Sequence, residues 1–405
     1  MRAGADETVS TMQPAAAPAL VEGVLVVVPP VPNGNPAGLS DCVIAGLPLV
    51  RRIVLAARSA GFAQVLVRDV EPGTRRLLDG TAATLLTTRS VVGRPSRRRV
   101  VTLPANVVPQ VRWLRSLLEA PIARETLYVD PSLAVVVDTD DPARIIDAAA
   151  RATDASTLVA ELRPRFLAVA QPADPDGRFP LVASRDVQAA EAWLLASLVK
   201  QREGFMSRHF ERRLSLALTR RLAPTAVTPN AMTLTSAAIG LAGAPFFLSA
   251  SPAWQLAGAL LFLAHSVLDG CDGEIARLKF QQSRWGAVLD YWGDNVVHVA
   301  VFACIAVGWS LSIGAAWPLA LGLVAAAATL GSAALMFERT AEDRVAAPGA
   351  AGRLIDALGN RDFIYVVVLL SAFGKAAWFL VAAAVGAPAF VVLVVWLERR
   401  HGRLF

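Results

Sequence analysis

The sequence predicts a multidomain chain, in which an N-terminal α/β domain precedes an all-α domain of six transmembrane helices. Over residues 19–200, short β-branched runs alternate with amphipathic stretches, which is the pattern of a layered α/β domain. From Pro229 onward the chain contains apolar runs long enough to cross a bilayer. The mean hydropathy of +0.48 and the 55% of hydrophobic residues also exceed those of an ordinary soluble protein.

The N-terminal domain is expected to contain a mainly parallel sheet. Residues 1–18 precede this domain as a flexible tail that contains Ala and Pro. A closing helix is expected over residues 186–200, where the domain ends. The apolar runs predict strands over Val24–Val28, Ala63–Val67, Val100–Leu103 and Leu133–Val137, and a helix over Leu47–Ala60.

Residues 201–226 join the two domains and are predicted to contain a basic amphipathic helix. Between Met206 and Arg221, five arginines alternate with Phe and Leu side chains. This composition is typical of a helix that lies on an anionic membrane surface, and an ordinary interdomain helix is the alternative.

The transmembrane domain, residues 227–405, is divided by short polar or charged connections. We predict six spans, near residues 229–249, 252–274, 286–309, 315–337, 362–374 and 376–396. Cationic residues gather in the connections on one side of these spans, and Lys375 is the single exception on the other side. The positive-inside rule therefore places both termini in the cytoplasm, as in a multi-pass protein of the cell inner membrane.

The remaining composition excludes several kinds of site. The net charge of +6 comes almost entirely from arginine, and no basic stripe is interleaved with aromatics, so we expect no nucleic-acid partner. Cys42, Cys271 and Cys304 lack the spacing of a disulfide framework or a zinc site.

Four aspartates stand out because they lie in apolar sequence. Asp269 and Asp272 are three residues apart, and Asp290 and Asp294 are four apart, so each pair projects from one face if both stretches are helical. Two facing helices would bring the four carboxylates into one pocket. Such an oxygen-only set suits Mg²⁺ or Mn²⁺, and two such ions can hold a diphosphate during its displacement.

The same segment resembles the signature of the CDP-alcohol phosphotransferase family, which consists of integral membrane enzymes. The matching positions, with the family's spacing, are Asp269, Asp272, Gly273, Ala276, Arg277, Gly286, Asp290 and Asp294. The resemblance implies transfer of a substituted phosphate from a CDP-linked donor to an alcohol acceptor, with release of CMP, in phospholipid or phosphodiester biosynthesis. It also implies that the lipid bilayer surrounds the enzyme and that the enzyme forms a homodimer.

The resemblance also implies roles for the aspartates. Asp269, Asp272 and Asp290 would ligate the metal that binds the donor diphosphate. Asp294 would complete a second metal position or act as the base toward the acceptor hydroxyl. Asp290 and Asp294 are thus the expected catalytic residues.

Several further residues are candidates for binding the substrates. Gly273, Ala276 and Gly286 would let the nucleotide approach the backbone, and close helix packing is their alternative role. Arg277 would pair with a donor phosphate or with a motif aspartate. Glu274, which follows Gly273 in the sequence, is expected to face solvent or to pair with another residue.

Two polar residues open the first span, and an arginine enters the fifth. Asn230 and Thr233 would contact the cytidine, with helix capping as the alternative for Asn230. Arg361 would bind an acceptor phosphate, with a membrane-edge anchor as its alternative. His265 and His298 are expected to pack or to satisfy a polar neighbour.

The N-terminal domain weakly resembles a nucleotidyltransferase, in its first strand, loop and helix. Its loop carries Pro29, Pro30, Pro32 and Pro36, which lack the N–H groups of a phosphate cradle. The expected position of a metal-binding Asp falls in residues 103–106, which contain no carboxylate. We therefore expect a degenerate domain that no longer transfers nucleotides.

Three alternatives remain open from the sequence. The chain would be bifunctional if the N-terminal domain made the CDP-alcohol by cytidylyl transfer. It would be a cation transporter if its intramembrane aspartates lined a polar path across the membrane. Asp138, Asp140 and Asp141 would form a metal site in the N-terminal domain, although a solvated strand end or a helix cap is expected there.

Overall fold

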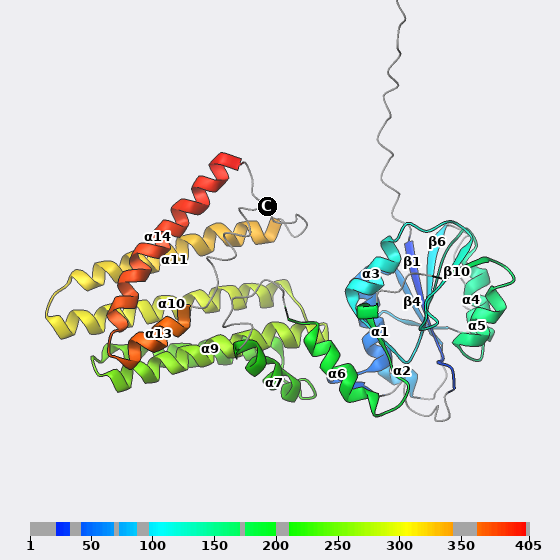
Figure 1. Ribbon diagram of the computed structural model, residues 1–405, viewed down its shortest axis with the longest axis horizontal. Coiled ribbons are helices and arrows are strands. Elements are labelled where there is room, and N and C mark those ends of the chain that lie inside the picture. Colours follow the sequence, from blue (N-terminus) through cyan, green and yellow to red (C-terminus); the bar gives the residue numbers. More distant parts are fainter. Residues whose placement is uncertain are drawn as a thin grey trace, which may run out of the picture. The chain divides into compact units, whose positions relative to one another are not determined.

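The computed structural model describes residues 22–32, 42–68, 73–86, 97–170, 175–199, 210–342 and 363–401. The chain divides into two compact units (Figure 1). The first comprises Met1–Asp41 and Leu49–Ala183, and the second comprises Cys42–Pro48 and Ser184–Phe405. The predicted combination of an α/β region followed by a helical region is confirmed.

The first unit contains a seven-stranded sheet with helices on both faces. Helices α1 (Leu49–Ala60) and α3 (Val111–Glu119) lie on one side, and α4 (Pro142–Arg151) and α5 (Ala155–Leu162) on the other (Figure 1). In spatial order the strands are β10 (Leu167–Ala170), β8 (Thr126–Val129), β9 (Val135–Thr139), β6 (Arg98–Pro104), β1 (Glu22–Val28), β4 (Gln64–Arg68) and β5 (Thr84–Leu86). The shorter elements are helix α2 (Thr74–Leu77), the 3₁₀ turn η1 (Pro175–Gly177) and the paired strands β7 (Val107–Pro109) and β11 (Arg178–Pro180).

Strand β1 lies at the centre of the parallel part of the sheet. It pairs in parallel with β4 and β6, and every residue after Glu22 is buried. Its unbroken apolar run is what a strand covered on both faces requires. The four predicted strands are present, with boundaries that differ by one or two residues.

Strand β9 departs from the parallel arrangement because it runs antiparallel to both β6 and β8. A tight turn from Asp130 to Ala134 joins β8 to β9, with the Leu133 N–H donating to the Asp130 carbonyl at 2.8 Å. So short a connection can only join antiparallel strands. The sheet is therefore antiparallel on both sides of β9 and parallel elsewhere.

The first predicted helix starts two residues later than expected. Strands β2 (Val43–Ile44) and β3 (Leu47–Pro48) form a hairpin before α1. Ala45 and Gly46 form its two-residue turn with φ of 46° and 80°, which is the geometry that hairpin turns of this length favour. The hairpin belongs to the second unit, as does helix α6 (Asp186–Ala196).

Asp138 is a buried ion-pair partner, so the expected solvated position is wrong for this residue. Arg97 donates two hydrogen bonds to its carboxylate, at 3.0 and 2.7 Å, and the Arg99 guanidinium lies 3.8 Å away. Asp140 is exposed and pairs with Arg124. Asp141 occupies the N-cap position of α4, but its side chain makes no capping hydrogen bond. These three aspartates therefore serve separate structural contacts.

The hydrogen bond from Arg97 lowers the pKa of Asp138 below its usual value, and burial opposes this shift. A carboxyl whose pKa is lowered by folding stabilises the protein above its unfolded pKa, which is about 4. That contribution is lost as the pH falls through the lower, folded-state pKa.

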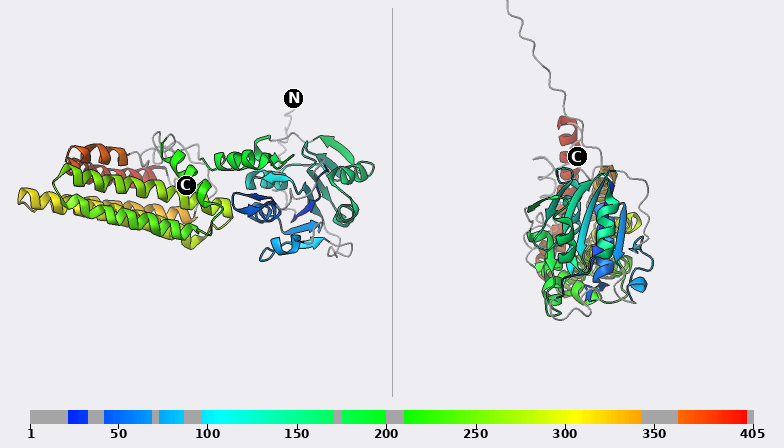
Figure 2. Two further views of the ribbon diagram at one scale, coloured as in Figure 1. Left: turned by 90° about the horizontal axis from the view of Figure 1, so that it is seen from below. Right: turned by 90° about the vertical axis from the view of Figure 1, so that its right-hand side faces the viewer.

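The second unit contains long apolar helices that lie side by side (Figure 2). They are preceded by α7 (Arg212–Leu222). The bundle consists of α8 (Pro229–Gly243) with the 3₁₀ turn η3 (Ala244–Leu248), α9 (Pro252–Lys279), α10 (Arg284–Ile313), α11 (Trp317–Glu342), α13 (Phe363–Ala372) and α14 (Ala376–His401).

Five of the six predicted spans are long and apolar enough to cross a membrane: α8 with η3, α9, α10, α11 and α14. The predicted fifth span corresponds to α13, which is apolar but has 10 described residues. A helix of that length reaches about 15 Å, half of a bilayer's hydrocarbon core. The described residues therefore support five membrane helices, and the sixth span stays a prediction.

We expect Asp138→Asn to destabilise the protein by about 3 kcal/mol, because it leaves the buried Arg99 without its carboxylate partner. Thermal unfolding should show this loss at pH 7, and the difference from the wild type should shrink as the pH falls below about 4 toward the lowered pKa of Asp138. Asp141→Asn is the control, because its pair with Arg144 is exposed. Equal effects of the two substitutions would contradict the buried ion pair.

Candidate functional site

Three aspartates from two neighbouring helices lie together in the helical unit. Asp269 and Asp272 project from α9, and Asp290 projects from α10. One carboxylate oxygen of each lies within 4.8 Å of the others. Asp269 and Asp272 are buried, at 6% and 5% exposure. The spacing of three residues on α9 thus places both of its carboxylates on the face that meets α10.

The start of α8 completes this group. Thr228 caps the helix by accepting a hydrogen bond from the Ala231 N–H, and Pro229 occupies its first turn. One turn later, the buried Thr233 hydroxyl donates a hydrogen bond to the Asp272 carboxylate. This bond fixes the orientation of Asp272 from a third helix.

Asp294 lies one turn further along α10 and is not part of the group of three. Its Oδ1 lies 3.1 Å from Nε2 of His265, a side chain on α9 that is 1% exposed. His298 Nδ1 lies 2.7 Å from the Asp294 backbone carbonyl oxygen. Both histidines contact polar groups of α10, and His265 positions the Asp294 carboxylate.

A cavity of about 670 Å³ opens beside Asp272 and Asp290. This volume is within the range of small-molecule sites. Six of the predicted substrate-binding residues line it: Asn230, Thr233, Gly273, Ala276, Arg277 and Gly286. Arg361, the seventh, lies outside the described residues.

Gly273 and Gly286 lie where there is little room for a side chain. A Cβ on Gly286 would come within 2.9 Å of the Asn230 side-chain oxygen, and one on Gly273 would come within 3.2 Å of an Arg277 nitrogen. A larger residue at position 286 would therefore displace Asn230 from the cavity wall. The small residues keep the cavity open between α8, α9 and α10.

Sequence reasoning missed several residues that line the same cavity. Gln281, Gln282, Ser283 and Arg284 come from the turn between α9 and α10, and Tyr291 and Phe337 complete the wall. The Tyr291 hydroxyl donates to the Ala333 carbonyl at 2.8 Å, which joins α10 to α11. Tyr291 follows Asp290 directly in the sequence, which could have suggested that it lies near the site. No spacing pattern, however, predicts that a tyrosine at this position lines the cavity.

Glu274 is fully buried, so the expectation that it faces solvent is wrong and the pairing alternative is right. Arg212 donates to its Oε1 at 2.5 Å, and the Ser215 hydroxyl donates to the same oxygen at 2.7 Å. The Thr219 hydroxyl donates to Oε2 at 2.6 Å. All three partners belong to α7, so Glu274 attaches that helix to α9 beside the aspartates.

These contacts also define the amphipathic character of α7. Ser215 and Thr219 are buried against α9, whereas Arg213, Arg220 and Arg221 are exposed. Leu214 is also exposed, at 45%. The outer face therefore carries both arginines and an apolar side chain, as the predicted helix on a membrane surface would.

The three aspartates fit a divalent cation. Their oxygens form the donor set that Mg²⁺ and Mn²⁺ prefer. Three carboxylates within 4.8 Å repel one another strongly when ionised, and a cation between them removes that cost. Among the described residues, this is the single such group of acidic, His or Cys side chains.

Comparison with known proteins agrees with the family resemblance of the aspartate segment. The family model for CDP-alcohol phosphatidyltransferases matches residues 226–396. The chain is 35% identical over 122 residues to "Bifunctional IPC transferase and DIPP synthase" of Thermococcus kodakarensis, an alignment that covers 30% of this chain and 27% of that protein. It is 35% identical over 92 residues to "CDP-diacylglycerol--serine O-phosphatidyltransferase" of Mycobacterium bovis, covering 20% of this chain and 31% of that protein.

The alignments thus span less than a third of the length of these curated relatives. Among solved structures, phosphatidylinositol phosphate synthase of Mycobacterium tuberculosis with CDP-DAG bound is similar, with 19% identity and a TM-score of 0.33. That similarity covers 45% of this chain and 94% of the other.

We expect Glu274→Gln to destabilise the helical unit by about 3 kcal/mol, because Arg212, 14% exposed, loses its charged partner. Thermal unfolding in detergent measures this change, and faster tryptic cleavage within α7 would show that the helix has detached. Arg213→Gln, an exposed neighbour, should unfold like the wild type. An unchanged melting temperature and cleavage rate for Glu274→Gln would contradict the attachment.

Proposed function

We propose that the protein is a membrane CDP-alcohol phosphotransferase, because the family model for CDP-alcohol phosphatidyltransferases matches residues 226–396. It transfers a substituted phosphate, such as a phosphatidyl group, from a CDP-linked donor to an alcohol and releases CMP. The observation that carries this proposal is the group of Asp269, Asp272 and Asp290 beside a cavity of about 670 Å³. That arrangement offers a cation site next to room for a nucleotide.

In this proposal, Asp269, Asp272 and Asp290 hold Mg²⁺ or Mn²⁺, with Asp294 completing a two-metal site or serving as a base. When bound, the cations neutralise the donor diphosphate and stabilise the charge that develops on it. Thr233 holds Asp272 in place through its hydroxyl. The Asp272 carboxylate is thus positioned by the protein before the donor enters.

The acceptor oxygen forms a bond to the phosphorus of the substituted phosphate, while the bond from that phosphorus to the oxygen of CMP breaks. The acceptor hydroxyl loses its proton in this step, and Asp294 accepts it in the base role. The contact with His265 at 3.1 Å holds the Asp294 carboxylate in one orientation. Such positioning is the protein's main contribution to in-line transfer.

The cavity walls supply the donor contacts. Arg277 would pair with a donor phosphate, and Asn230 would bind the cytosine or ribose edge. Gly273, Ala276 and Gly286 leave the backbone accessible to the nucleotide. Arg361 stays a proposal for the acceptor phosphate.

We further propose that the N-terminal unit is a degenerate nucleotidyltransferase-like domain. The Asn106 side chain, at the carboxyl end of β6, donates to the Leu181 carbonyl at 2.7 Å. In the described part of this unit, no three acidic, His or Cys side chains lie close enough together to share a metal ion. Both features favour a structural or regulatory domain over cytidylyl transfer.

A bifunctional enzyme is the second candidate, because a relative is named "Bifunctional IPC transferase and DIPP synthase". We expect no release of pyrophosphate when the full-length protein is given CTP and alcohol phosphates. Release that depends on the N-terminal residues would favour the bifunctional enzyme.

The cation transporter is disfavoured by the packing beyond the site. Phe262, Phe302 and Ile305 belong to an apolar cluster that fills the bundle between α9, α10 and η3. A transporter needs a polar path through this region. Cytoplasmic termini, location in the cell inner membrane, and a homodimer stay proposals that rest on the cation distribution and on the family.

Release of CMP by the purified protein in lipid nanodiscs tests the proposed function. The assay offers CDP-diacylglycerol or soluble CDP-alcohols with a panel of acceptors: inositol phosphate, glycerol phosphate and serine. We expect acceptor-dependent release that requires Mg²⁺ or Mn²⁺ and falls at least about 100-fold in Asp272→Asn and Asp290→Asn. Asp140→Asn, an exposed aspartate of the other unit, should keep full activity. No release with any donor, or release indifferent to these substitutions, would refute the proposal.

Thr233→Val should weaken cation binding about tenfold, because ligand-orienting partners typically contribute that much. Titration with Mn²⁺ followed by electron paramagnetic resonance measures the affinity directly. Thr235→Val is the matched control, since its hydroxyl donates only to the Ala231 carbonyl of its own helix, at 2.8 Å. Equal affinities of the two variants would rule out a role for Thr233 in positioning Asp272.

A further inference from the structure

A second cavity, of about 380 Å³, lies at the other end of the helical unit. Its walls come from η3, the starts of α9 and α14, and the end of α10. Along α9, its lining residue Gln255 precedes Asp269 by 14 residues, so the two lie about 21 Å apart along the helix. None of the residues assigned to phosphate transfer lines this cavity.

Lys375 gives this cavity its one formal charge. No carboxylate and no other cation occurs among the 14 lining residues. Within the described part of the chain, the Lys375 ammonium has no hydrogen-bond or ion-pair partner. The cavity therefore offers a positive group that is available to an anion.

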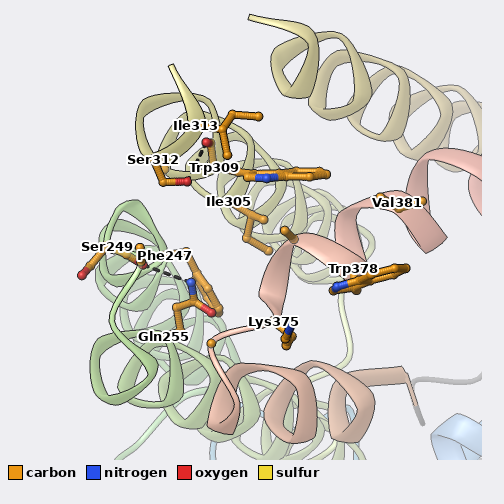
Figure 3. Close-up of a pocket in the computed structure, with 14 residues that line it drawn as sticks. Phe247, Ser249, Gln255, Ile305, Trp309, Ser312, Ile313, Lys375, Trp378 and Val381 are labelled. Atoms are coloured by element: carbon orange, nitrogen blue, oxygen red, sulfur yellow. Dashed lines mark hydrogen bonds between the residues drawn. The ribbon is translucent and has the colours of Figure 1, made fainter. Parts of the chain in front are cut away.

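The position of Lys375 is set by a rigid frame. Gln255, 8% exposed, donates to the Ser249 carbonyl at 3.1 Å and accepts from the Ala376 N–H at 3.2 Å. Gly374, with φ of 68°, forms the turn that leads into α14. Because Ala376 is thus fixed to α9, Lys375 is kept at the edge of the cavity, between Gln255 and Trp378 in the view of Figure 3.

The rest of the lining is mostly apolar and aromatic. Trp309, Trp378, Phe247, Ile305 and Val381 surround the space (Figure 3). Trp378 is 64% exposed, and Trp309 packs edge-to-face on Trp317 at 4.6 Å between ring centroids. Tryptophans at helix ends mark the level of the lipid headgroups. The cavity therefore combines one cation with an apolar wall at the membrane–water interface.

Ser249 adds a polar contact. Its hydroxyl oxygen accepts a hydrogen bond from the Ser251 N–H at 3.1 Å, which leaves the hydroxyl hydrogen to donate. In Figure 3 the Ser249 side chain lies on the other side of Gln255 from Lys375, so the Lys375 ammonium is the group that would bind a phosphate.

We propose that this cavity binds the headgroup of an anionic phospholipid, with the lipid phosphate at Lys375 and the glycerol and upper acyl region against Trp378 and Val381. A soluble anion would gain from the ammonium but not from the apolar wall, whereas a lipid gains from both. The site is independent of phosphate transfer, because it lies at the opposite end of α9 and α10.

Native mass spectrometry of the delipidated full-length protein tests the proposal. The protein is incubated with phosphatidylglycerol or with phosphatidylcholine, and bound lipids are counted. We expect preference for phosphatidylglycerol to fall about fivefold in Lys375→Gln and to be kept in Lys375→Arg, since one cation near a lipid surface contributes about that factor. Trp254→Ala is the control, because Trp254 is 55% exposed at the same end but does not line the cavity.

A second variant separates the cavity from the charge. Ala377→Phe should fill the space and lower phosphatidylglycerol binding while Lys375 remains. If Lys375→Gln lowered phosphatidylglycerol binding and Ala377→Phe did not, the lysine would attract headgroups of the surrounding lipid without a lipid in the cavity. That result would overturn the proposal. The proposal would also be overturned if Lys375→Gln kept the wild-type preference for phosphatidylglycerol. Displacement of the bound phosphatidylglycerol by millimolar inorganic phosphate would overturn it as well, because the site would then bind any phosphate.

Discussion

The helical unit depends on holding three carboxylates close together inside apolar helices. Asp269, Asp272 and Asp290 have oxygens within 4.8 Å of one another, and two of these side chains are almost fully buried. Ionised carboxylates at this distance require compensation. The proposed cation site would supply that compensation, and it accounts for the small residues at 273, 276 and 286 and for the Thr233 hydroxyl where α8, α9 and α10 meet.

Helix α9 uses its carboxylates in two different ways. Asp269 and Asp272 face α8 and α10, where a cation and a nucleotide would bind. Glu274, two residues later, faces α7 and is satisfied by Arg212, Ser215 and Thr219. One face of the helix thus carries the proposed cation site, while the next attaches the amphipathic helix that would lie on the membrane surface.

Features that depend on local spacing could be predicted from the sequence. The aspartate pairs, the β-branched strands and the long apolar helices follow from periods of 3.6 and 2 residues. Features that depend on distant partners could not. Glu274 is paired with a residue 62 positions earlier, and the buried Asp138 is paired with Arg99 on the neighbouring strand and with Arg97 just before that strand. The second cavity likewise combines residues 247–255, 305–313 and 374–381, which no motif connects.

The central claim is that Asp269, Asp272 and Asp290 hold the divalent cation on which phosphate transfer depends. Anomalous diffraction at the manganese edge, from crystals of the protein grown with Mn²⁺ and CMP, locates the ion directly. The account predicts anomalous density between α9 and α10, in contact with these three carboxylates and beside the cavity that holds CMP. Manganese bound elsewhere, with CMP in the cavity and no ion at the aspartates, would contradict it.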